Sequence, residues 1–145
     1  SVTEVIKYYR ETGGKFSKRA ALELLFLAGQ ILQEAGETGP QQGVYSHGDL
    51  NPSRILVKED GDVQIIGYGM PSPEVLGMTQ GLKVDPHAES MYYAPPERLV
   101  AAAEDVSSDL YSLACIAVEL ITQSPLFEGA VEDVQRARVA TMERR

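Results

Sequence analysis

The sequence predicts a mainly α fold with one small β-hairpin, an α+β arrangement, as a single domain over residues 1–145. Three observations lead to this fold class. Apolar residues recur at helical spacing over residues 17–36. The segment 109–122 is apolar on almost every face at the same spacing, which predicts a buried central helix. Two short apolar runs, 55–57 and 63–66, flank an acidic segment that contains a glycine, which predicts a hairpin.

The first two helices have clear end signals. Thr3 can cap a short helix, and Gly13 can end it because glycine suits the residue after a helix. Ser17 can cap a second helix, which Gly36 and Gly39 are expected to close. The apolar stripe of that second helix consists of Leu24, Leu27, Ala28, Ile31, Leu32 and Ala35.

The second half of the chain follows the hairpin. Residues 67–92 are rich in Gly, Pro, Met and Ser without a steady period, which indicates a long surface loop. Pro95 can open a short helix, since proline fits a first helical turn. Ser107 or Ser108 is expected to cap the central helix. Residues 130–143 predict a polar amphipathic helix.

The charge balance excludes some partners. Thirteen basic and 21 acidic residues give a net charge of −8, which disfavours nucleic acid and anionic membranes as partners. The sequence shows no apolar run long enough to span a bilayer and no signal-like segment, so we expect a cytoplasmic protein. The single cysteine, Cys115, is expected to be buried, and His87 is expected in a loop. Two histidines and one cysteine do not predict a zinc site, and we expect no cofactor.

Three motifs in order carry a family resemblance. Residues 47–57, His-Gly-Asp-Leu-Asn-Pro-Ser-Arg-Ile-Leu-Val, resemble the catalytic loop of eukaryotic-type Ser/Thr protein kinases. Residues 92–97, Tyr-Tyr-Ala-Pro-Pro-Glu, are similar to the end of an activation segment. Residues 108–113, Ser-Asp-Leu-Tyr-Ser-Leu, look like the start of the central helix of that family. The resemblance implies a kinase-like C-terminal lobe without the N-lobe and without the last C-lobe helices.

The resemblance also assigns roles to the loop residues. Asp49 matches the base that accepts the substrate hydroxyl proton, and His47 matches a residue that packs. Gly48 replaces an arginine that pairs with a phosphate on the activation loop. Arg54 and Gly67 stand where the family has the Asn and Asp that hold magnesium. These departures predict a pseudokinase with a vestigial Asp49, not an enzyme.

Several residues have two readings. Asp49 is either a structural remnant or a working base, and Arg54 either pairs with Asp49 in place of magnesium or is solvated. The resemblance implies that Asp109 holds the catalytic-loop backbone by accepting amide hydrogen bonds; otherwise it favours the helix start. Pro96 and Glu97 belong to the second motif, and Glu97 is expected to be solvated or to pair with another arginine.

The expected function is a protein-interaction scaffold or regulator. A partner protein, or a second copy in a homodimer, would cover the face around residues 45–68, which the N-lobe covers in relatives. Ser90 is a candidate phosphorylation site or an ordinary exposed serine. The alternative function is an atypical phosphotransferase completed by an N-lobe from another chain or from outside these residues. An adaptable binding surface, or else packing under the loop, is expected at Met70, Met78, Met91, Tyr92 and Tyr93.

Overall fold

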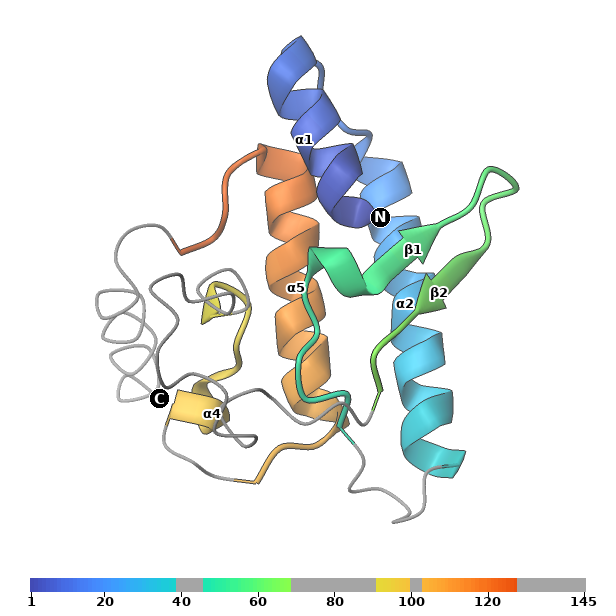
Figure 1. The fold of residues 1–145 in the computed structure, drawn as a ribbon, viewed down its shortest axis with the longest axis vertical. Coiled ribbons are helices and arrows are strands. Elements are labelled where there is room, and N and C mark those ends of the chain that lie inside the picture. Colours follow the sequence, from blue (N-terminus) through green and yellow to red (C-terminus); the bar gives the residue numbers. More distant parts are fainter. Residues whose placement is uncertain (39–45, 69–90, 100–102, 128–145) are drawn as a thin grey trace, which may run out of the picture.

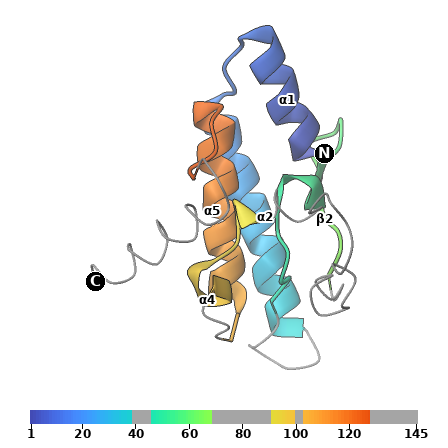
Figure 2. The ribbon, with the colours of Figure 1, turned by 60° about the vertical axis from the view of Figure 1, so that its left-hand side comes forward.

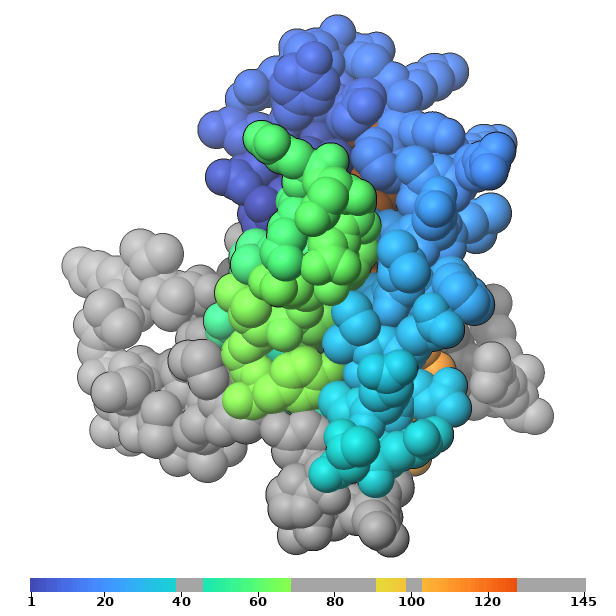
Figure 3. Space-filling model, turned by 90° about the vertical axis from the view of Figure 1, so that its right-hand side faces the viewer, coloured from blue at the N-terminus to red at the C-terminus, as the bar shows by residue number. Residues whose placement is uncertain are grey.

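Two long antiparallel helices, α2 and α5, lie side by side and form the centre of the structure (Figure 1; Figure 2). The computed structural model describes residues 1–38, 46–68, 91–99 and 103–127, which are mainly helical with one two-stranded antiparallel sheet. The hairpin lies against α2 (Figure 3). The elements in chain order are α1 (Val2–Thr12), α2 (Lys18–Thr38), the 3₁₀ turn η1 (Pro52–Arg54), β1 (Ile55–Val57), β2 (Val63–Ile65), α4 (Pro96–Leu99) and α5 (Val106–Thr122).

The core forms where α2 packs on α5. The predicted stripe of α2 is largely confirmed, since Leu24, Ala28 and Leu32 are buried at steps of four. From α5, Leu113, Ile116 and Leu120 complete the core; Leu32, Leu113, Ile116 and Leu120 are almost fully buried. Each such aliphatic side chain contributes about 1.5–3 kcal/mol on burial. This contact fixes α5, which carries residues of the site.

The helix ends correct several predicted caps. The N-cap of α1 is Ser1 and not Thr3, because the helix already begins at Val2. The N-cap of α5 is Asp105, whose carboxylate accepts a 2.8 Å hydrogen bond from the Ser107 amide, so neither Ser107 nor Ser108 caps this helix. Gly36 does not end α2 but lies buried within it. Gly13, with φ of 66°, ends α1 as predicted.

The hairpin has the predicted position and a defined register. Ile55 pairs with Ile65 and Val57 with Val63, so β2 ends at Ile65, one residue earlier than expected. The pairing continues by one hydrogen bond, 3.0 Å long, from the Ile66 amide to the Arg54 carbonyl. Because of this register, Arg54 lies beside the residues that follow β2.

Helix α5 is the largely buried central helix that the sequence predicts. It also buries the polar residues Ser108, Asp109, Ser112 and Glu119, while Leu110 and Ala114 are exposed. Short helix α4 lies where Pro95 and Pro96 predicted one. The predicted helix at 130–143 and most of the predicted loop at 67–92 fall outside the described residues. Among the described helices, none has the length and apolar character needed to cross a membrane.

Candidate functional site

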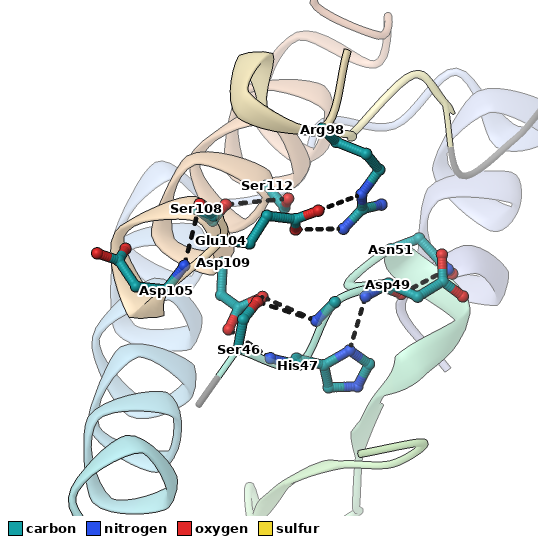
Figure 4. A network of polar contacts seen from close by, with 11 residues as sticks. Ser46, His47, Asp49, Asn51, Arg98, Glu104, Asp105, Ser108, Asp109 and Ser112 are labelled. Atoms are coloured by element: carbon teal, nitrogen blue, oxygen red, sulfur yellow. Dashed lines mark hydrogen bonds and ion pairs between the residues drawn. The ribbon is translucent and has the colours of Figure 1, made fainter. Parts of the chain in front are cut away.

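Asp109 at the start of α5 holds the loop that contains Asp49. Its Oδ2 accepts a 2.7 Å hydrogen bond from the His47 amide, and its Oδ1 accepts one of 3.3 Å from the Gly48 amide. The Ser46 hydroxyl donates a third, 3.0 Å long, to Oδ1 (Figure 4). This is the amide anchor that the resemblance implied for Asp109, so the loop backbone and α5 form one unit.

The anchor carries an electrostatic cost. Burial raises the pKa of the Asp109 carboxyl, because a charge loses hydration in the interior. The hydrogen bonds from His47, Ser46 and Gly48 act in the opposite direction and lower it. Three donors therefore partly offset the desolvation of this carboxylate. Removal of the carboxylate would leave the His47 amide unpaired, whereas the Gly48 amide also donates to the Ser46 hydroxyl, 3.1 Å away.

His47 connects the loop to the end of the hairpin. Its Nδ1 accepts a 3.2 Å hydrogen bond from the Asp49 amide, so this nitrogen carries no proton. Its Nε2 then donates to the Ile66 carbonyl, 2.9 Å away. The buried ring also packs edge-on against Tyr68, with ring centroids 4.7 Å apart. The packing role expected for His47 matches this position.

Asn51 locks the backbone that follows Asp49. Its amide group donates a 3.0 Å hydrogen bond to the Asp49 carbonyl (Figure 4). Its Oδ1 accepts from the amide and the hydroxyl of Ser53, at 3.0 and 2.6 Å. Asp49 is thus fixed through its amide by His47 and through its carbonyl by Asn51. Its carboxylate remains available for partners outside the loop backbone.

Arg54 supplies that partner. Its Nη2 lies 3.2 Å from Oδ2 of Asp49, in a pair whose side chains are 27% and 12% exposed. Of the two readings of Arg54, the structure therefore shows the ion pair. The Nε atom of Arg54 is buried and has no hydrogen-bond partner in the described part of the chain.

Gly67 lies directly against Arg54. A Cβ placed on residue 67 would be 3.2 Å from Nη1 of Arg54, 3.3 Å from its Cδ and 3.4 Å from its Cζ. The φ angle of Gly67 is +92°, a conformation that residues with a side chain rarely adopt. The side chain of Arg54 therefore fills the space that a side chain at position 67 would enter.

Magnesium, which the resemblance implies at this place, does not fit the residues present. Gly67 offers no carboxylate, and Arg54 brings a positive charge instead of a neutral amide oxygen. Across residues 1–38, 46–68, 91–99 and 103–127, no three or more His, Cys, Asp or Glu side chains are grouped so that they could hold a metal ion. Asp49 already faces a cation, the guanidinium of Arg54.

A second polar cluster escaped the sequence analysis. Buried Glu119 accepts hydrogen bonds from Arg10 of α1 and from the hydroxyl of Tyr93. These three residues, with Ile6 and Pro52, line a cavity of about 370 Å³ next to the catalytic loop. The available signal was Glu119 itself, a single charge in the otherwise apolar run 113–121.

The remaining predicted site residues are dispersed. Tyr93 is 4% exposed and its hydroxyl donates to Glu119, which fits the packing alternative for this residue better than a binding surface. Met91 and Tyr92 are partly buried, and Met70, Met78, Ser90 and His87 lie outside the described residues.

Pro96, from the motif at residues 92–97, is the first residue of α4. Oε2 of Glu97 is buried and has no hydrogen-bond partner among the residues described. Arg98, the next residue, pairs instead with both carboxylate oxygens of Glu104, at 2.9 and 2.7 Å. Arg98 therefore does not form an ion pair with Glu97.

Comparisons with known proteins agree with the loop geometry. Residues 23–144 match the protein kinase domain family. Cyclin-dependent kinase G1 of Arabidopsis thaliana is 34% identical over 90 residues, 59% of this chain and 14% of that protein. Mitogen-activated protein kinase hog1 of Aspergillus glaucus is 34% identical over 84 residues, 57% of this chain and 21% of that kinase. The probable cyclin-dependent kinase 8 of Dictyostelium discoideum is 33% identical over 138 residues, 89% of this chain and 34% of that protein.

These matches correct one expectation. The substitutions at Arg54 and Gly67 predicted that the chain is not an enzyme, but the family and the named kinases point to an enzyme. The expectation was wrong because it equated lost metal ligands with lost activity. The chain spans about a seventh to a third of the length of these relatives. By its family match over residues 23–144, this chain belongs to the protein kinase domain family.

Proposed function

We propose that this chain carries the hydroxyl-activating part of an atypical phosphotransferase, with Asp49 as the general base. The observation that supports the proposal is the fixed carboxylate of Asp49. Its amide donates to His47 and its carbonyl accepts from Asn51, while its carboxylate pairs with Arg54. A base must be held within hydrogen-bond reach of the proton it accepts, and this loop is built to hold one.

The reaction is transfer of the γ-phosphoryl group of ATP to an alcohol. The alcohol oxygen forms a bond to the γ-phosphorus, the bond from phosphorus to the departing ADP oxygen breaks, and Asp49 takes the hydroxyl proton. Catalysis of such transfers depends on positioning and on charge stabilisation more than on covalent participation by the protein. In this proposal, an N-lobe from another chain or from a longer polypeptide that contains residues 1–145 would bind the adenosine of ATP.

The test uses the polypeptide that contains residues 1–145 together with its nucleotide-binding lobe. Radiolabelled ATP and a library of peptides with Ser and Thr hydroxyls are supplied, and labelled peptide is counted. We expect transfer by the wild-type protein and a loss of about a hundredfold or more in Asp49→Asn, the usual contribution of a general base. Asp62→Asn, on the exposed hairpin turn, is the matched control and keeps its activity. Equal rates in wild type and Asp49→Asn would exclude Asp49 as the base.

A second candidate function is protein binding on the hairpin face, with a second copy of the chain as the simplest partner. The observation that favours it is the exposure of two large apolar side chains within the predicted face, Val57 at 44% and Ile66 at 42%. Both belong to the hairpin, Val57 at the end of β1 and Ile66 directly after β2. Large apolar side chains left exposed on one short element favour an interface.

Light scattering tests this binding. The wild-type chain is expected to have the mass of a dimer, and a Val57→Ser, Ile66→Ser double variant the mass of a monomer. Leu22→Ser, which removes an exposed leucine on α2, is the control and should leave the mass of the dimer. A monomeric wild type would contradict self-association, and a dimer that persists in the double variant would place the interface elsewhere.

A further inference from the structure

Arg54 and Gly67, the two positions that depart from the metal-binding pattern, touch each other. The hairpin register brings them together, because Ile55 pairs with Ile65 and the Arg54 carbonyl accepts from the Ile66 amide. Nη1 of Arg54 is 3.2 Å from the place where a Cβ of residue 67 would lie. Glycine at 67 is therefore what gives the guanidinium its room. The two substitutions form one spatial change, in which a carboxylate is removed and a cation takes up its space.

The guanidinium keeps capacity for a further ligand. Nη2 bonds Asp49 and Nε is buried, so an incoming ligand meets the guanidinium through the exposed part of a side chain that is 27% exposed overall. Arginine presents five donors in a planar fork that matches the oxygens of a phosphoryl group. The nearby cation Arg98 has its Nε and Nη2 engaged by Glu104, so it is less available than Arg54 for an incoming anion.

We infer that Arg54 takes the place of a divalent cation in this site and binds the phosphoryl group of the ligand directly. The choice of a nucleotide phosphate as the natural ligand rests on the proposed function, whereas the anion site itself rests on Arg54, Asp49 and Gly67. The positive charge beside Asp49 then belongs to the protein, and binding of a phosphoryl group needs no added metal.

Calorimetric titration with inorganic pyrophosphate tests this inference. We expect the wild-type chain to bind pyrophosphate in EDTA, with an affinity that excess Mg²⁺ does not increase. Arg54→Gln removes the charge and should weaken binding about tenfold, the effect of losing one charge-assisted hydrogen bond. Arg54→Lys keeps the charge without the planar fork and should give an intermediate affinity. This variant keeps the test decisive if Arg54→Gln fails to fold by circular dichroism.

Lys58→Gln is the matched control for loss of a positive charge. Lys58→Gln removes a positive charge from the same hairpin, where Lys58 pairs with Asp62, and should bind pyrophosphate as the wild type does. Absence of binding in EDTA, binding that requires Mg²⁺, or unchanged affinity in Arg54→Gln would each overturn the inference. Failure of peptide phosphorylation together with Arg54-dependent pyrophosphate binding would reject the proposed function and leave the anion site standing.

Discussion

The loop around Asp49 has two ends that differ in how completely their polar groups are satisfied. At the Asp109 end, the carboxylate accepts from Ser46, His47 and Gly48, and the group is buried. At the Arg54 end, a partly exposed ion pair leaves Nε of the arginine without a partner in the residues described. The first end has the character of a structural anchor, and the second has the character of a binding site.

The difference explains which residues of the kinase pattern could change. A substitution at Asp109 leaves the buried His47 amide without an acceptor, so the pattern is retained there. The side chain of Arg54 is 27% exposed, so solvent partly screens a change of charge at this position and the fold tolerates it more easily. The Asp109 end fixes the position of the loop, and the Arg54 end sets the charge next to Asp49.

Removal of the anchor should have the largest effect. Asp109→Ala leaves the buried His47 amide unpaired and removes one of the two acceptors of the Gly48 amide, and we expect a loss of about 3 kcal/mol in the free energy of unfolding. Urea denaturation followed by circular dichroism measures it. Asp109→Asn keeps one acceptor and should lose less. A loss below about 1 kcal/mol in Asp109→Ala would remove the contrast between the two ends of the loop.

The cap of α5 should have an intermediate effect. Asp105→Ala removes the acceptor for the Ser107 amide and should cost about 1 kcal/mol at neutral pH. The hydrogen bonds from Ser107 lower the pKa of Asp105, so its contribution is present above its ordinary pKa of 3.8 and is lost as the pH falls through the lowered value. Asp105→Asn, which caps without a charge, should not show this loss. Thermal melts of the three proteins from neutral pH to pH 3 measure the difference, and a pH-independent gap between wild type and Asp105→Ala would contradict it.

The partly exposed ion pair of Asp49 and Arg54 should have the smallest effect on stability. A double-mutant cycle with Asp49→Asn and Arg54→Gln should give a coupling of about 0.5 kcal/mol, because solvent screens a partly exposed pair. The same cycle on Lys58 and Asp62, which are more exposed, should give less. A coupling of zero would mean that the contact contributes nothing to folding, and one as large as the loss in Asp109→Ala would make this end an anchor too.

Much of the fold could be predicted from local pattern. The stripe on α2, the hairpin turn and the proline before α4 are short-range signals, and each lies where it was expected. The caps were less predictable, because Ser1 and Asp105 compete with Thr3, Ser107 and Ser108 for the same role. Which of several nearby polar residues becomes the N-cap depends on the residue at which the helix begins, and tertiary packing decides that position.

The site also contains residues whose roles the sequence indicated and contacts that it did not indicate. The family resemblance implied the roles of Asp109 and His47, because both residues belong to the motifs that carry it. The contact of Arg54 with Gly67 depends on the hairpin register, and the cluster of Arg10, Tyr93 and Glu119 joins residues from three distant segments. Such long-range contacts leave no local pattern. Glu119 alone gave a hint, because a charge in an apolar helix needs a buried partner.

Binding of Mn²⁺, followed by nuclear magnetic resonance, tests the central claim most directly. An Arg54→Asn, Gly67→Asp double variant restores the two metal-binding side chains of the kinase pattern. In that variant, Mn²⁺ should broaden the amide signals of Gly48 and Asp49. In the wild-type chain, the same Mn²⁺ concentration should leave both signals sharp, because Arg54 already provides the cation. Equal broadening in the two proteins would contradict the claim that Arg54 replaces the metal.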